Sequence, residues 1–225
     1  MKIKWGALVV DGRGKIGGQV ASKNKSGAYM RNKVTPTNPQ TTAQTSARQL
    51  FSGISQNWSA LTEAQRDTWN EGVDSWGTTD VFGDLKNPTG KALYQRLNNQ
   101  AQSAGLSALD TLPAHVAVGQ GVVTAAVLDL SDVNITLTGA NSELATTIML
   151  FATAVLSDGT SFVKNRLRNI YNVNAASYSD TAAYTAYVNK FGVPAEGRNV
   201  YVGVVYVMAT GQSSPMQIVK MTVQA

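Results

Sequence analysis

Three glycines near the start of the chain have the spacing of a dinucleotide-binding motif. Gly12, Gly14 and Gly17 follow the apolar residues 7–10 in the pattern G-x-G-x-x-G. In a Rossmann fold such glycines let the backbone approach a pyrophosphate at the amino end of the next helix. Here the next residues, GQVASKNKSGAYM, favour a helix poorly, and no acid occurs between Asp11 and Glu63 to bind a ribose. We therefore expect no nucleotide site and predict that the chain binds no cofactor.

Other residues with catalytic or metal-binding potential are few. The chain has no cysteine and one histidine, His115, and no serine stands in a G-x-S-x-G turn that a catalytic triad could use. The segment NPTGKALY lacks the first glycine and the hydroxyl residue of a phosphate-binding P-loop. The carboxylate pairs Asp80 with Asp84 and Asp129 with Asp132 stand where aspartates form caps and turns. We interpret all of these as structural residues and predict neither catalytic nor metal-binding residues, and hence no enzyme.

Positive charge is concentrated at the start of the chain. Residues 1–62 contain nine Lys and Arg residues and one acid, Asp11, which gives +8, whereas the remainder has ten bases and thirteen acids, which gives −3. This asymmetry predicts a basic segment that contacts a negatively charged partner, either nucleic acid or an acidic protein surface. A solvated segment without a partner is the plain alternative. The predicted interface residues are Trp5, Arg13, Lys15, Lys23, Lys25, Tyr29, Arg31 and Lys33.

The pattern of residues predicts three regions, 1–37, 38–110 and 111–225. Residues 1–37 are rich in glycine and in small and basic residues, which favours an extended basic arm that becomes ordered on a neighbour, with short strands at 3–10, 18–21 and 28–34. Residues 38–110 have apolar residues at helical intervals. Helix starts are indicated by Asn38-Pro39, by a capping box from Thr62 to Gln65 and by Asn87-Pro88, and the third helix is predicted over 90–103.

From residue 113 onward the sequence changes to short, β-branched segments separated by turns. One helix interrupts them, in SDTAAYTAYVNKFG, with Ser179 or Asp180 as its cap. Six or seven strands in about 110 residues predict an antiparallel β-sandwich of immunoglobulin or fibronectin type. The expected fold class is therefore α+β.

Composition limits the cellular setting. Of all residues, 43% are hydrophobic and 15% are charged, as in a folded protein rather than a disordered one. The apolar run 7–10 is shorter than the core of a secretory signal or a membrane span. We expect a soluble chain that is neither exported nor bound to a membrane.

Three stretches resemble structural proteins of tailed bacteriophages, notably crAss-like and related phages of Bacteroidetes hosts. They are GKIGGQVASKNKSGAYMRNKVTPTNPQTTAQTSAR, WSALTEAQRDTWN and FGDLKNPTGKALYQRLN. The resemblance covers residues 14 to about 98 and extends to the C-terminal region only in general pattern. It implies membership of the virion, assembled in the host cytoplasm, and brings no catalytic or cofactor residues.

The expected function is that of a non-enzymatic virion protein. We favour an auxiliary, or cement, capsid protein whose arm binds the shell, with the major capsid protein or portal and ring proteins as partners and a multimer in the particle. The alternative is a connector ring between head and tail. An alternative of another class is a nucleic-acid-binding protein that uses the same arm. The arm has only two aromatic residues, Trp5 and Tyr29, so we expect DNA contact to be secondary.

Overall fold

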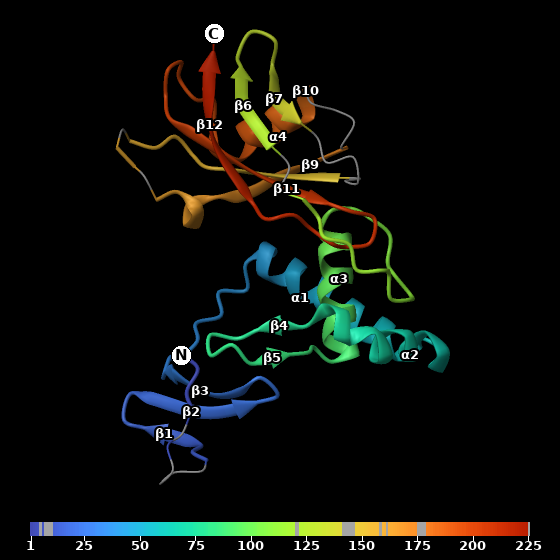
Figure 1. Cartoon of the computed structure of the whole chain (residues 1–225). Helices are drawn as coiled ribbons and strands as arrows, with labels where there is room; N and C mark the ends of the chain where they lie inside the picture. Colours follow the sequence, from blue (N-terminus) through green and yellow to red (C-terminus); the bar gives the residue numbers. More distant parts are fainter. Residues whose placement is uncertain are drawn as a thin grey trace.

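The structure, a computed structural model, describes residues 1–4, 6, 11–119, 122–140, 147–157, 159–160, 162–174 and 179–224. Figure 1 shows three parts arranged in the order of the sequence. A small N-terminal sheet lies beside a group of helices, and these helices lie beneath a strand-rich C-terminal domain. The chain is thus a mixed α and β protein, as predicted.

The N-terminal part is a small antiparallel sheet. Strands β1 (Gly14–Ile16), β2 (Gln19–Asn24) and β3 (Gly27–Asn32) pair in sequence order. Residues 1–3 continue the sheet beyond β3, because Lys2 forms a bridge with Tyr29 and Ile3 donates its amide hydrogen to the carbonyl of Ala28. The prediction of an extended arm is therefore wrong over residues 14–32. Gly17, with φ of +57°, makes a tight reversal possible, so this segment pairs with itself.

This N-terminal sheet has almost no core of its own. Among the described apolar residues of 1–37, Ala21 is the one that is buried. The glycine-rich motif forms β1 and the turn into β2 instead of a turn into a helix, so the predicted absence of a helix after these glycines is confirmed. Most of the expected strand 3–10, including Trp5, lies outside the described residues.

The helical region packs around tryptophan and leucine side chains. It contains α1 (Thr42–Ala60), α2 (Glu63–Glu71), the 3-10 helix η1 (Gly72–Trp76), a hairpin of β4 (Thr78–Thr79) and β5 (Leu85–Lys86), and α3 (Gly90–Ser103). Trp69, Leu93 and Tyr94 are almost fully buried at its centre. The predicted capping box between Thr62 and Gln65 and the predicted bounds of the third helix are confirmed.

The other two predicted caps are wrong by two or three residues. The N-cap residues are Thr41 and Thr89, whose hydroxyls accept from the amides of Gln44 and Ala92. Asn38 accepts a hydrogen bond from Arg48, and Asn87 donates one to Asp74, so both asparagines have other partners. Pro39 and Pro88 therefore lie before their helices rather than in the first turn.

The C-terminal domain is built on one seven-stranded sheet. Its strands are β6 (Val122–Asp129), β7 (Asn134–Ala140), β8 (Thr147–Ala152), β9 (Arg168–Asn174), β10 (Ser179–Asp180), β11 (Val200–Val207) and β12 (Gln217–Gln224). They follow the order β10-β7-β6-β12-β11-β8-β9. A short 3-10 helix, η2 (Lys164–Arg166), precedes β9, and α4 (Thr181–Phe191) begins at its predicted cap, Asp180.

Two strand predictions require correction. The pair β6–β12 is parallel, so the pairing is not wholly antiparallel. Residues 113–119 form no strand, although their apolar alternation predicted one. They lie against the helical region. The side chain of Gln212, from the loop between β11 and β12, bonds to the backbone of Ala114 and Val116 in place of a neighbouring strand. The strand-rich C-terminal part of the fold prediction is confirmed.

The sheet encloses its core together with α4. This helix contacts β7 and β9, which stand near opposite ends of the strand order, so the sheet must curl around it. Ile148, Leu150, Val202 and Val204 are buried on the inner face beside Tyr187 of α4. A curled sheet capped by one helix buries all of these side chains with few residues.

A second, smaller core joins this domain to the helices. Met149, Val205 and Val207 lie on the outer face of β8 and β11 and pack against Ala104 at the end of α3. Because both faces of β8 and β11 are covered, their sequences TIMLFA and VYVGVVYV are almost continuously apolar. Gly211 lies so close to α3 that an added Cβ would be 2.4 Å from the carbonyl oxygen of Leu97.

Candidate partner-binding surface

One face of the N-terminal sheet gathers several of the predicted interface residues. In the strand register, Lys15 stands opposite Val20 and Val20 opposite Arg31, so the three form one row across the sheet. The next row on this face has Ser22 opposite Tyr29. We call Lys15, Val20, Ser22, Tyr29 and Arg31 the basic face. Among the described residues, neither Lys15 nor Arg31 forms an ion pair, and both are exposed.

The remaining predicted interface residues do not join this face as one group. Lys23 pairs with Ala28, which places it on the opposite face of the sheet. Lys25 occupies the turn between β2 and β3, and its ammonium lies 3.5 Å from the carbonyl of Pro88. Arg13 forms an ion pair with Asp11 at 3.4 Å, and Lys33 follows β3 and is exposed. Trp5 lies outside the described residues.

Part of the positive charge is neutralised within the chain. Lys2 lies 3.4 Å from a carboxylate oxygen of Asp80, and Lys4 lies 3.1 Å from one of Asp84. The ammonium of Lys4 also stands 5.1 Å from the centre of the Phe82 ring. The loop between β4 and β5 therefore holds the N-terminal sheet against the helical region. Sequence reasoning missed this contact, although Asp80 and Asp84 are the first acids after Asp74 and flank a short turn.

The Asp80 carboxylate has two amide hydrogen bonds in addition to its ion pair. Burial of the Asp80 carboxyl by itself would raise its pKa, but amide hydrogen bonds from Phe82 and Asp84, followed by the ammonium of Lys2, outweigh that effect. The net result is a pKa below the ordinary value of 3.8. Phe82 and Asp84 donate at 2.8 and 3.2 Å, so Asp80 also shapes the loop that presents Asp84.

Substitution of Asp80 is expected to loosen the N-terminal sheet. Asp80→Asn should speed hydrogen exchange of the β3 amides by roughly twofold to fivefold at pH 7, because it removes an ion pair whose cation, Lys2, is partly exposed to solvent. A carboxylate with a lowered pKa stabilises above its unfolded pKa, and the effect is lost as the pH falls through the folded value. The ratio of variant to wild-type exchange rates should therefore approach one in acid. An acid-independent ratio would contradict the assignment.

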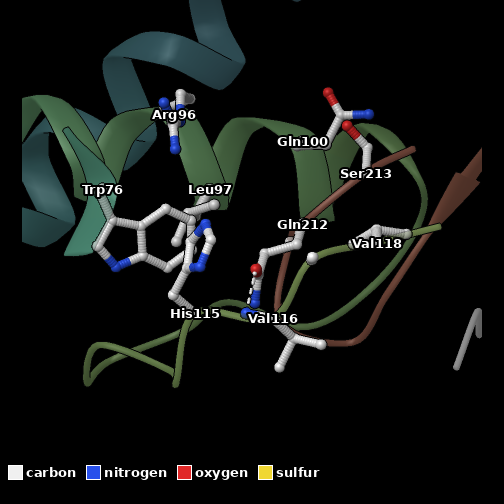
Figure 2. Close-up of a pocket in the computed structure, with 11 residues that line it drawn as sticks. Trp76, Arg96, Leu97, Gln100, His115, Val116, Val118, Gln212 and Ser213 are labelled. Atoms are coloured by element: carbon white, nitrogen blue, oxygen red, sulfur yellow. Dashed lines mark hydrogen bonds between the residues drawn. The ribbon is translucent and has the colours of Figure 1, made fainter. Parts of the chain in front are cut away.

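A hollow at the domain junction is lined by Trp76, Arg96 and His115, among other residues. Its volume is about 300 Å³, and Figure 2 shows Trp76 and His115 together at one side of it. The rings of Trp76 and His115 meet edge to face, with centroids 4.6 Å apart, and the Arg96 guanidinium lies 5.4 Å from the Trp76 ring centre. Gln212 accepts from the amide of Val116 and donates to the carbonyl of Ala114, both at 2.9 Å. These contacts fix the loop to the junction, consistent with a structural role for His115.

One carboxylate of each predicted pair, Asp80 and Asp129, accepts the hydrogen bonds of a turn, as the sequence predicted. Asp129 accepts from the amides of Ser131 and Asp132 and from the Ser131 hydroxyl. The hydrogen bond from Asp132, followed by that from the Ser131 side chain, lowers the pKa of the Asp129 carboxyl against the opposing effect of burial. Over the part of the chain that the structure describes, no group of three His, Cys, Asp or Glu side chains could hold a metal ion.

None of the helices in the described segments is both long enough and apolar enough to cross a membrane.

Comparison with known proteins assigns no family to this chain. No protein-family model matches the chain, and no curated protein does. A solved structure of an Fn3-like protein from Clostridium thermocellum is similar to it, at 20% sequence identity and a TM-score of 0.29. That similarity covers 45% of this chain and 88% of the other.

Proposed function

We propose that this chain is a non-enzymatic structural subunit of a bacteriophage virion, an auxiliary capsid protein that binds neighbouring subunits through its basic face. The observation that carries the proposal is that Lys15 and Arg31, which have no ion-pair partner among the described residues, share one face of a sheet with almost no core of its own. A small sheet of this kind gains stability and order when a partner covers it. The resemblance of residues 14–98 to tailed-phage structural proteins supports the same reading.

The C-terminal domain fits a role as a rigid module. We interpret it as a variant of the β-sandwich in which both layers remain joined through one sheet. Its inner core and its junction with α3 are both apolar, so it can keep the N-terminal sheet at a constant position. A connector ring between head and tail remains the second form of this function, and the acidic surface described below favours it.

Binding to particles tests the proposal directly. Full-length protein should co-sediment with purified particles that lack it, and mass spectrometry should find it in complete virions. Lys15→Gln with Arg31→Gln should weaken binding about tenfold or more, because both cations face the partner. Lys23→Gln, on the opposite face of the same sheet, is the matched control and should bind normally. A chain absent from virions and unable to bind particles would refute the proposal.

The nucleic-acid alternative makes a different prediction about the same variant. Duplex DNA would bind the wild-type chain with an affinity that falls steeply with salt, and Lys15→Gln with Arg31→Gln would reduce that salt dependence. Binding to DNA without binding to particles would favour this alternative.

A further inference from the structure

Helix α2 carries an acidic stripe that has no ion-pair partner in the part of the chain that the structure describes. Glu63, Asp67 and Glu71 follow each other at intervals of four residues, which places them along one side of the helix. All three are exposed, and none takes part in any of the ion pairs found among the described residues. Arg66, the one base of α2, is half-buried beside the stripe and likewise forms no ion pair there.

The stripe is electrostatically unfavourable in an isolated chain. Like charges four residues apart on a helix repel each other. Glu63 lies in the first turn, where the helix dipole favours an acid, but Glu71 is the last residue of α2 and the last turn has no base. A cationic partner would therefore offset both the repulsion and the unfavourable position of Glu71.

The basic face matches the acidic stripe in charge and in spacing. Lys15 and Arg31 are separated by one intervening strand, so their backbones lie about 10 Å apart. Glu63 and Glu71 are eight residues apart on a helix, or about 12 Å, with Asp67 midway. Figure 1 shows the N-terminal sheet and α2 at opposite sides of the molecule. The two surfaces are thus placed to meet between copies rather than within one.

We propose that the basic face of one copy docks on the acidic stripe of a second copy of this chain. This inference rests on the proposed function and names the neighbour that the basic face contacts. The contact is head to tail, so each added copy leaves one free surface of each kind. Such a contact closes into a ring or continues along a lattice of neighbouring positions. The half-buried Val20 lies between the two cations, and the half-buried Tyr29 lies beside Arg31 on the same face, so both add apolar area to it.

Two complementary neutral variants test the contact. The first is Lys15→Gln with Arg31→Gln, and the second is Glu63→Gln with Asp67→Asn and Glu71→Gln. Sedimentation velocity should show concentration-dependent association of the wild-type chain and monomers for each variant alone. An equimolar mixture of the variants should form a dimer and stop there, because each supplies one intact surface. Recovery in the mixture also shows that both variants are folded.

Salt and matched substitutions complete the test. Raising the salt concentration from 50 to 500 mM should raise the dissociation constant of the wild-type contact about tenfold or more, because exposed charges are screened. Lys23→Gln and Glu196→Gln, exposed charges away from both surfaces, should associate normally.

Each contrary result has a definite meaning. A wild-type chain that stays monomeric, variants that still self-associate, or a mixture that remains monomeric would overturn the inference. If the chain is monomeric but its binding to particles depends on Lys15 and Arg31, the proposed function stands and the shell is the partner. If association depends on both surfaces but the chain is absent from virions, the contact stands and the proposed function fails. Loss of DNA binding in the first variant, without any self-association, would assign the basic face to nucleic acid.

Discussion

Trp69→Ala is expected to lower the free energy of unfolding of the helical region by about 3–5 kcal/mol. The indole of Trp69 is fully buried and meets the ring of Tyr94 edge to face, with centroids 5.2 Å apart. Its N–H donates to the carbonyl of Asp110 at 2.9 Å, which ties the chain after α3 to α2. Alanine would leave a large cavity and remove the hydrogen bond to Asp110.

A neighbouring tryptophan provides the control for this prediction. Trp58 also lies 5.2 Å from Tyr94 but is only half-buried, so Trp58→Ala should cost clearly less, about 1–2 kcal/mol. Urea unfolding followed by circular dichroism measures both changes. A loss below about 1 kcal/mol for Trp69→Ala, or equal losses for the two variants, would contradict the central place given to Trp69.

Gly211→Ala is expected to destabilise the junction between the helices and the C-terminal domain by about 2–4 kcal/mol. Gly211 has φ of +72°, which a residue with a side chain rarely adopts. An added Cβ would also lie 2.4 Å from the carbonyl oxygen and 2.9 Å from the carbonyl carbon of Leu97, and this backbone belongs to α3. Neither atom can move without displacing the helix from the sheet.

The chain contains a matched control for Gly211. Gly197 has the same φ of +72°, but nothing lies within 4 Å of an added Cβ. Gly197→Ala should therefore cost only the backbone strain, about 1–2 kcal/mol. The difference between the two unfolding free energies measures the contact with α3. Equal losses of unfolding free energy in the two variants would show that the close approach of Gly211 to Leu97 does not affect stability.

Local signals predicted the helices well. The capping box at Thr62 and Gln65, the third helix over 90–103 and the cap at Asp180 all depend on residues within one helical turn. The two caps that were placed wrongly, at Asn38 and Asn87, also had local competitors, the threonines at 41 and 89. Asn38 bonds instead to Arg48, and Asn87 bonds to Asp74. These partners lie more than one helical turn away in the sequence, so local signals did not reveal them.

Long-range pairing was beyond the same reasoning. The parallel pair β6–β12 places Ala126 opposite Met221, and no local sequence pattern near either strand indicates its partner. The N-terminal sheet was missed for a related reason. Glycines that suit an extended arm suit hairpin turns equally well, and only the register shows that Lys15 and Arg31 share a face while Lys23 lies behind them.

The sequence by itself determined the residue types available, with an excess of cations before residue 62, no cysteine and a single histidine. It also indicated where several helices begin, through their capping residues. These follow from composition and from interactions within a few residues, which any fold of this chain must respect. Only the tertiary structure decided which cations Asp80 and Asp84 neutralise, which cations of the described residues form no ion pair, and where α2 lies relative to the N-terminal sheet. Charge pairing depends on distances of a few ångströms between residues far apart in the chain, and only packing sets those distances.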